Sequence, residues 1–209
     1  MPFIDITRTL VAGTAVWPGD APFRLQHSAE LARGDSVNLT RLNLSAHTGT
    51  HVDAPYHFAA AGATLEAVPL HSYWGPAQVV TVTKEAGPLH PADFAAYDLS
   101  LAPRLLVHSA ASHLPQTEFP SEFIYPTPDL AAHLAQSGVI LFGSDAPSMD
   151  PQDSKTLAGH HALRAHDIAI LEWLDLRQAP DGLYELAALP LKIAGGDGSP
   201  VRAVLRLPE

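Results

Sequence analysis

Apolar and β-branched residues gather in short runs along the chain, and turns rich in proline and glycine separate these runs. Runs of this length and composition are typical of β-strands. The 19 Pro and 14 Gly suit many short elements joined by turns. We predict strands at Phe3–Ile6, Val37–Leu44, Gln78–Thr83, Arg104–His108, Val139–Phe142, Ile168–Leu174, Gly182–Leu186 and Val201–Leu207.

Helical segments are fewer. Pro91–Tyr97 opens with proline, which is favoured at the first helical position. Thr127–Gln136 begins with threonine at the N-cap position, and a glycine soon follows its end. A third short helix is expected over Leu157–Ala165. The pattern predicts an α/β fold: a β-rich single domain, residues 1–209, with a mixed sheet and a few short helices.

Length and charge narrow the class of protein. A chain of 209 residues fits one domain with one core. The 12 basic and 22 acidic residues give a net charge of −10, which argues against nucleic acid or an anionic membrane as partner. No run of 18 apolar residues and no basic segment of the signal-peptide type is present, so we expect a cytoplasmic protein.

Cysteine is absent, whereas the chain has 12 histidines. The absence excludes disulfides, thiolate zinc fingers, iron–sulfur clusters and cysteine nucleophiles. An acidic, histidine-rich chain without thiols raises the question of a metal held by imidazole and carboxylate groups.

The stretch Ser45–Phe58 supports a metal site. His47, His51, Asp53 and His57 lie at offsets of 0, 4, 6 and 10 residues. Even offsets place side chains on one face of an extended chain, whereas on a helix an offset of 6 turns about 120° away. We therefore predict a strand end that runs into a loop, where the first three converge as zinc ligands. The alternative is a set of surface polar residues in a turn.

A second candidate ligand lies downstream. Glu172 interrupts an apolar run, and alternation places it on one strand face with Ile170 and Leu174. A buried carboxylate needs a partner, and a metal ion is a sufficient one. The alternative is a strand-end Glu172 that reaches water or an arginine, such as Arg164 or Arg177.

Two adjacent histidines, His160 and His161, lie on the predicted third helix. Neighbouring helical side chains point about 100° apart, so both cannot easily face one site. The residues by themselves do not choose between them.

The segment Ser-x-His-x-Gly-Thr-His-x-Asp-Ala-Pro-x-His-Phe, residues 45–58, resembles the signature of the metal-dependent cyclase-like amidohydrolases. Further likeness to this family spans nearly the whole chain. It is found at Trp17–Asp20, Ser144–Asp145, Asp153–Leu157, Tyr184–Lys192 and Asp197–Ala203.

The resemblance implies a swivelling β/β/α (cyclase-like) fold, a homodimer with active sites near the subunit contact, and two Zn²⁺ ions per subunit. The first ion would be held by His47, His51 and Asp53. Asp53 would bridge to the second ion, which His160 and Glu172 complete. This ligand set selects His160 because the family's histidine precedes its glutamate by twelve residues.

The resemblance also implies an activity. His57 would donate and accept the proton, and Trp17 would contact an aromatic ring of a small-molecule substrate. The reaction implied is hydrolysis of an aryl formamide, N-formyl-L-kynurenine, to L-kynurenine and formate, a step of tryptophan degradation.

Three alternatives remain open. The first is another amidohydrolase of this family, of the isatin-hydrolase kind, and the second is a non-catalytic metal-binding protein. The third is a serine hydrolase, which needs Gly-x-Ser-x-Gly. The near candidates, Gly143–Asp145 and Gly198–Pro200, do not match it. A zinc protease of the His-Glu-x-x-His type is also disfavoured, because Thr48 follows the first histidine.

Overall fold

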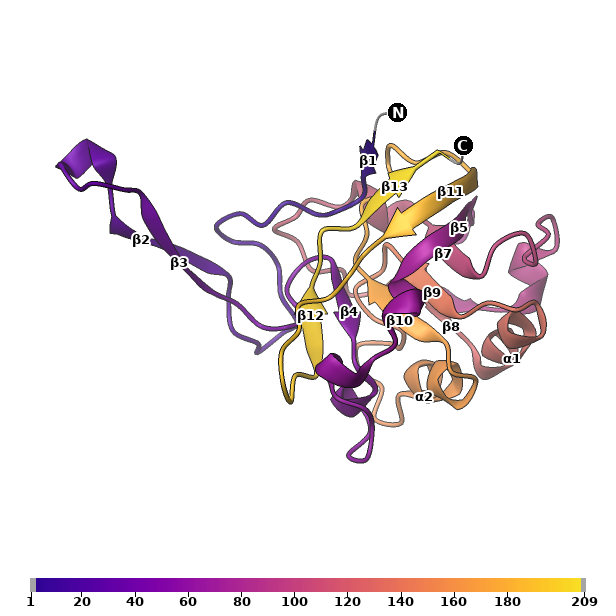
Figure 1. Ribbon diagram of the computed structural model, residues 1–209. Helices are drawn as coiled ribbons and strands as arrows, with labels where there is room; N and C mark the ends of the chain where they lie inside the picture. The colour runs from indigo at the N-terminus through magenta and orange to yellow at the C-terminus, as the bar shows by residue number, and fades with distance from the viewer. Residues whose placement is uncertain (1–2, 208–209) are drawn as a thin grey trace.

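A computed structural model describes residues 3–207 and has a nine-stranded mixed sheet at its centre (Figure 1). In spatial order the strands are β1 (Phe3–Asp5), β13 (Val204–Arg206), β11 (Gly182–Ala187), β5 (Trp74–Thr81), β7 (Arg104–His108), β9 (Leu141–Ser144), β10 (Ala169–Glu172), β4 (His51–Asp53) and β12 (Gly198–Pro200). The four strands β5, β7, β9 and β10 are parallel neighbours, and the pairs outside them are antiparallel. The predicted fold class is confirmed.

The remaining elements are short. β2 (Arg24–Ala29) pairs with β3 (Leu39–Asn43), and β6 (Gly87–Leu89) pairs with β8 (Ile124–Pro126). The α-helices are α1 (Pro128–Gln136) and α2 (Ala158–Ala165). The 3-10 segments are η1 (Leu31–Arg33), η2 (Pro55–His57), η3 (Leu65–Ala67), η4 (Leu70–Tyr73), η5 (Pro91–Phe94) and η6 (Ala110–His113). Across residues 3–207, no helix has the length and apolar character needed to cross a membrane.

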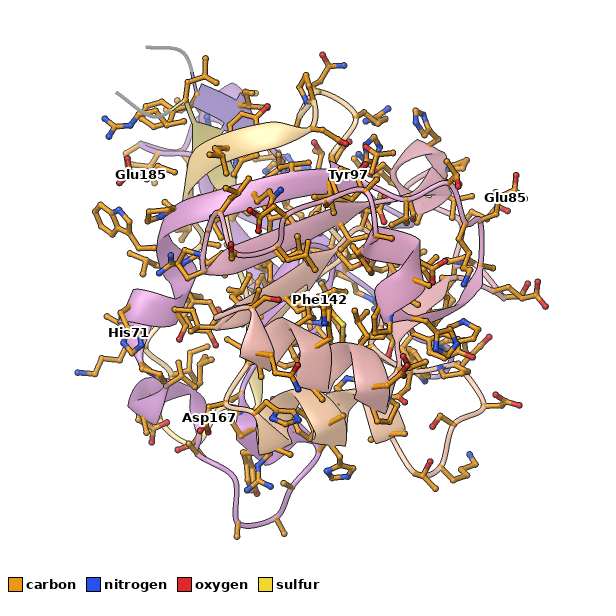
Figure 2. The ribbon with its side chains drawn as sticks, turned by 90° about the vertical axis from the view of Figure 1, so that its right-hand side faces the viewer. His71, Glu85, Tyr97, Phe142, Asp167 and Glu185 are labelled. Atoms are coloured by element: carbon orange, nitrogen blue, oxygen red, sulfur yellow. The ribbon has the colours of Figure 1, made fainter. Side chains whose placement is uncertain are left out.

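Both helices lie on one face of the sheet (Figures 1 and 2). Leu130 and Leu134 of α1 and Leu163 of α2 are buried in one cluster with Phe142 of β9. Full burial of such a side chain stabilises the fold by about 1.5–3 kcal/mol. This packing fixes α2 beside the sheet, which matters because α2 carries His160.

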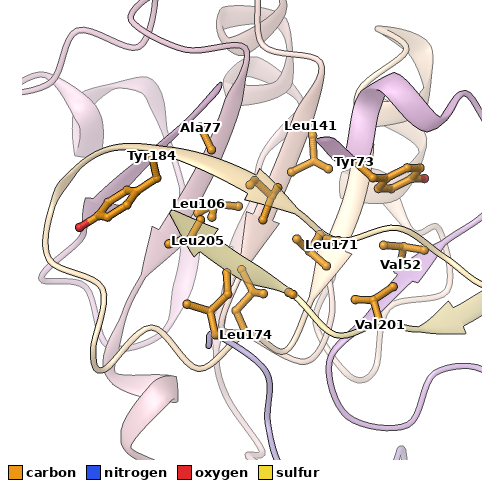
Figure 3. Close-up of a cluster of buried hydrophobic side chains, with 14 of the residues drawn as sticks. Val52, Tyr73, Ala77, Leu106, Leu141, Leu171, Leu174, Tyr184, Val201 and Leu205 are labelled. Carbon is orange, nitrogen blue, oxygen red and sulfur yellow. The ribbon is translucent and has the colours of Figure 1, made fainter. Parts of the chain in front are cut away.

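The opposite face of the sheet has its own apolar cluster (Figure 3). Side chains of a strand alternate between faces, so Leu106 of β7 enters this cluster while Leu105 and Val107 enter the first. Leu171 of β10 and Leu205 of β13 are also in it. Burial on both faces explains why the central parallel strands are near-continuous apolar runs.

The predicted helix over Pro91–Tyr97 is shorter than expected, since only the 3-10 segment η5 forms there. The predicted helix at residues 127–136 is confirmed with Thr127 at its N-cap. The Thr127 hydroxyl does not cap the helix; it donates to the carbonyl of Leu89 at 2.5 Å instead.

One strand is placed differently from what its sequence pattern predicts. The alternation within Val37–Leu44 is typical of a half-buried strand, yet every residue of β3 is exposed. β3 pairs only with β2, and the two form an arm, residues 24–43, that projects from the body (Figure 1).

The expected alternation through Leu174 is also wrong at its end. Trp173 has a φ of 56°, in the left-handed region, so the regular strand ends at Glu172. The chain then turns, and Leu174 packs in the cluster of Leu171 rather than in that of Ile170.

Candidate metal centre and active site

The pairing of β4 with β10 brings the two acidic candidates together. In this antiparallel pair Glu172 lies directly opposite His51, and Ile170 lies opposite Asp53. β12 pairs with the other edge of β4, with Gly198 opposite Asp53. Because β4 is held on both sides, its side chains are placed by rigid sheet rather than by a loop.

His47 lies beside His51 and Asp53, but it is not on the predicted strand. The strand begins only at His51, and residues 46–50 form a turn in which Gly49 has a φ of 66°. His57 lies beyond the strand, in η2. The expected strand end is therefore found at His51–Asp53, which runs into the turn of His57, but it is wrong at His47, which lies in a turn before the strand. Only His51 and Asp53 share its face.

The side chains nevertheless converge. Asp53 Oδ1 lies 3.0 Å from His47 Nδ1 and 3.5 Å from His51 Nε2, while Asp53 Oδ2 lies 3.5 Å from His160 Nε2. Glu172 Oε2 lies 3.2 Å from His51 Nε2, and Glu172 Oε1 lies 3.6 Å from His160 Nε2. The two oxygens of Asp53 thus face different histidines, as a bridging carboxylate would.

Several of these oxygens lack hydrogen bonds. Within the described residues, both oxygens of Asp53 and Oε1 of Glu172 are buried without a hydrogen-bond partner. A buried carboxylate needs positive charge beside it, from protonated imidazoles or from a metal ion. Imidazole nitrogens and carboxylate oxygens are the donors that zinc and similar divalent cations take. The donor set therefore fits a metal centre.

The alternative surroundings of Glu172 are not observed. Its side chain is only 4% exposed and faces His51 and His160, so it does not reach out to water. Arg177 pairs with Asp175 at 2.6 Å. The alternative of a solvated or arginine-paired Glu172 is wrong.

The carboxylates also change the acid–base properties of two histidines. Burial disfavours the charged form of His47, but Asp53 and Asp197 outweigh it and raise the pKa of His47 to about 9. Burial acts likewise on His160, and Asp150, Asp53 and Glu172 raise the pKa of His160 to about 10. With these pKa values, both imidazoles are cationic at neutral pH when no metal is bound, and they place positive charge beside the carboxylates.

The structure brings His160, and not His161, to the cluster. His160 is buried and directs Nε2 towards Asp53 and Glu172, whereas His161 is exposed. Asp150 orients it, with one carboxylate oxygen 2.6 Å from His160 Nδ1. Such a partner fixes the ring of a ligand histidine. Sequence reasoning missed Asp150, and no spacing pattern signals it.

His57 lies at the edge of this cluster. Its Nδ1 is 3.4 Å from Asp197 Oδ2, which is also 3.1 Å from His47 Nε2. Ligand atoms of His47, Asp53 and His57 lie within 4.8 Å of one another, as do those of His51, Asp53 and Glu172. Asp197 was also missed, although its segment carries part of the family resemblance.

A pocket of about 230 Å³ opens onto the centre. His47, His51, His57, His160 and Glu172 line one part of it, and Trp17, Phe119 and Trp173 line another. Phe119 contacts Trp17 and Trp173 edge-to-face, with ring centroids 5.5 Å apart in each pair. The cluster of titratable groups therefore adjoins an aromatic wall that includes Trp17, and the predicted contact of Trp17 with a substrate ring stays a prediction. The sequence did not point to Phe119 or Trp173.

Trp173 is held firmly in this wall. Its carbonyl accepts a hydrogen bond from Thr50 Oγ1 at 2.7 Å, and its amide donates to Ala146 O at 2.9 Å. The guanidinium of Arg8 lies 5.6 Å from the centroid of the indole ring, within cation–π range. These contacts fix the indole directly after Glu172.

Comparison with known proteins shows the family of the chain. The Cyclase family model matches residues 4–151, which include Trp17 and the segment from His47 to His57. The chain belongs to the cyclase family. Kynurenine formamidase of Salinibacter ruber (strain DSM 13855 / M31) is 46% identical to this cyclase-family chain over 207 residues, covering 99% of it and 98% of the relative.

Solved structures agree on the fold. A structure described as a predicted metal-dependent hydrolase from Bacillus stearothermophilus matches this cyclase-family chain with a TM-score of 0.82 and 28% identity, covering 98% of this chain and 97% of the other. Isatin hydrolase A from Labrenzia aggregata, bound to benzyl benzoate, matches with a TM-score of 0.84 and 24% identity, covering 100% and 94%.

Proposed function

We propose that this cyclase-family protein is a metal-dependent arylformamidase, a kynurenine formamidase, that hydrolyses N-formyl-L-kynurenine to L-kynurenine and formate. The observation that carries the proposal is the junction of a carboxylate–imidazole cluster with an aromatic wall in one pocket. An amide bond on an aromatic ring needs both parts. The 46% identity to a kynurenine formamidase over nearly the whole chain supports this substrate.

The proposed cofactor is two Zn²⁺ ions per subunit. His47, His51 and Asp53 would hold one, and Asp53, His160 and Glu172 the other. Support comes from Asp53, whose two oxygens face different histidines. When bound, the ions would supply Lewis acidity, which makes a water more acidic and stabilises negative charge on the amide oxygen.

The chain's own residues supply orientation and proton transfer. His57 would take the proton of the attacking water and return it to the aniline nitrogen that leaves. Asp197, 3.4 Å from His57 Nδ1, favours a ring orientation in which Nε2 remains free for this transfer. Trp17 and Phe119 would hold the aromatic ring, so that the formyl carbon lies at the cluster rather than in solvent.

An assay of purified protein tests this function directly. Turnover of N-formyl-L-kynurenine should exceed that of N-formylanthranilate and of isatin, with metal content measured on the same sample. Preferred ring opening of isatin would favour the isatin-hydrolase alternative. Bound metal without turnover of any of the three would favour a non-catalytic metal-binding protein.

Metal removal should abolish activity, and added Zn²⁺ should restore it. Protons compete with metal because the pKa values of His47 and His160 without metal are raised to about 9 and about 10. Each imidazole must lose a proton to bind a cation, so apparent metal affinity should rise with pH up to these values. Titration of residual activity with a chelator at pH 6 and pH 8 checks this, after correction for the chelator's own pH dependence. Equal metal affinity at both would contradict it.

Trp17→Ala should raise KM for N-formyl-L-kynurenine about tenfold and leave the fold intact, because an aromatic contact and its buried area are lost. Trp74→Ala is the matched control: Trp74 is an exposed tryptophan that bonds Glu185 and lies outside the pocket. Steady-state kinetics and circular dichroism of both variants decide. Unaltered kinetics of Trp17→Ala would remove Trp17 from the site.

We also propose a homodimer. An isolated two-stranded hairpin is marginally stable in water, yet every residue of β2 and β3 except the half-buried Ala29 is exposed, including the cross-strand pair Leu25–Leu42. A second copy that covers this arm would bury both side chains.

The double variant Leu25→Glu/Leu42→Glu should therefore shift the protein from a dimer, twice 22.2 kDa, towards the 22.2 kDa monomer. Leu101→Glu, at another exposed leucine, is the control. Light scattering at several concentrations measures the mass, and a dimeric double variant would place the contact elsewhere. A single domain over residues 1–209 and a cytoplasmic location complete the proposal and remain predictions.

A further inference from the structure

Three non-glycine residues in the described part of the chain have a positive φ: Leu157 (45°), Asp167 (55°) and Trp173 (56°). The left-handed region is unfavourable for residues with a Cβ atom. Such strain persists only where the surroundings impose it, and it concentrates at functional sites. Leu157 and Trp173 line the 230 Å³ pocket, whereas Asp167 does not.

The side chain of Leu157 has no polar atom and cannot cap the helix that follows it. Leu157 is the residue before α2, at the N-cap, where Ser, Thr, Asp, Asn or Gly is preferred. The capping role is performed from outside the helix by Asp150, which accepts from the amides of Gly159 at 2.8 Å and His160 at 3.0 Å. Glycine would adopt the left-handed conformation at residue 157 without strain.

The leucine side chain instead belongs to the pocket. It is half-buried and apolar, and it joins Trp17, Phe119 and Trp173 in the lining. Ser154 Oγ accepts from the amide of Leu157 at 3.1 Å and holds the backbone in its turn. Strain, an unsuitable residue type for a cap and a place in the pocket wall coincide at this one residue.

We propose that Leu157 is a specificity-determining residue, retained in a strained backbone conformation because its side chain packs against the aromatic ring of the substrate. The inference rests on the proposed arylformamidase function. It adds a residue of the ring-binding wall that is recognised by its conformation.

Four variants test the inference: Leu157→Gly, Leu157→Ala and, as matched controls at the other end of α2 (Figure 2), Asp167→Gly and Asp167→Ala. The zinc-loaded proteins are compared in Tm, in Kd for L-kynurenine by calorimetry, and in KM for N-formyl-L-kynurenine. Both Leu157 variants should weaken Kd and KM about tenfold, because a partly buried leucine contact is lost. Both Asp167 variants should keep the parent values.

The stability readout is separate from binding. Leu157→Gly should melt about 2–4 °C above Leu157→Ala, because only glycine relieves a left-handed φ. The same order is expected at Asp167. A higher Tm for Leu157→Ala than for Leu157→Gly, the usual order outside the left-handed region, would contradict the inference that the backbone is strained at Leu157.

Unchanged Kd and KM in both Leu157 variants would overturn the specificity role, as would a parent protein that does not bind L-kynurenine. A parent protein that binds L-kynurenine but does not turn over N-formyl-L-kynurenine would contradict the proposed function alone. The binding and melting comparisons are read without turnover, so the two failures are distinguishable.

Discussion

His57→Ala should lower kcat for N-formyl-L-kynurenine about 10²–10⁴-fold while leaving the metal content of the protein unchanged, because a positioned acid–base group contributes about this much. In the proposed reaction this imidazole receives a proton from water and delivers it to the leaving nitrogen. An aniline-type nitrogen needs that proton to depart, so both halves of the reaction depend on one side chain.

The location of His57 allows two roles, which the variant distinguishes. It lies in η2, just beyond the strand that carries His51 and Asp53, and its ligand atom is within 4.8 Å of those of His47 and Asp53. Proton transfer and metal binding are both sterically open to it. Metal analysis of the purified variant separates them: lost turnover with full metal assigns proton transfer, and loss of both assigns a ligand.

His161→Ala is the matched control for this variant. His161 is an exposed histidine on α2, adjacent in sequence to His160 but turned away from the cluster. Its removal should change neither kcat nor metal content. Activity of His57→Ala equal to that of this control would eliminate His57 from the mechanism.

Glu172→Ala should lose one metal equivalent per subunit, and its kcat/KM should fall by more than about 10²-fold. Partners that only orient a ligand cost 10–100-fold when removed, so a ligand itself should cost more. Glu172 carries a buried oxygen without a hydrogen bond and lies 3.2 Å from His51 and 3.6 Å from His160. Removal of this carboxylate should therefore weaken cation binding strongly.

Stability gives an independent reading of the same variant. A ligand that binds only the folded state raises Tm, so Zn²⁺ should raise the Tm of the parent protein more than that of Glu172→Ala. Glu185→Ala, which removes a surface carboxylate paired with Arg206, should retain the parent response. Unchanged metal stoichiometry in Glu172→Ala would exclude the ligand role, and the second ion would then need another carboxylate.

Local sequence was sufficient for those parts of the site that lie within one short segment. Three histidines and an aspartate between residues 47 and 57 cannot separate by much, and imidazole and carboxylate are groups that divalent cations bind. The reasoning from even offsets was right about convergence and about the strand at His51 and Asp53, but it was wrong about the conformation at His47. A glycine turn before β4 and a 3-10 turn after it bring the side chains together.

The same holds for the fold class. Apolar runs bounded by turn residues identified the central strands, and β7 was predicted with its observed bounds. The exposed arm was not predicted. Alternation in β3 indicates that one side of the strand favours burial, but it does not show whether the covering surface belongs to the same chain. An apolar pattern says that burial is favourable without saying what supplies it.

What the sequence by itself determined is the chemistry: imidazole and carboxylate donors, no thiols, an acidic chain and the strand and helix segments that hold the donors. What only the tertiary structure decided is which distant residues meet. The register of β4 against β10 sets Glu172 opposite His51, and the packing of α2 turns His160 towards the cluster and His161 away.

Asp197 and Phe119 likewise join the site through contacts between segments far apart along the chain. The physical reason is the range of the interactions. Spacing within a segment follows from backbone geometry, whereas strand register and helix orientation follow from burying two apolar faces of one sheet at once.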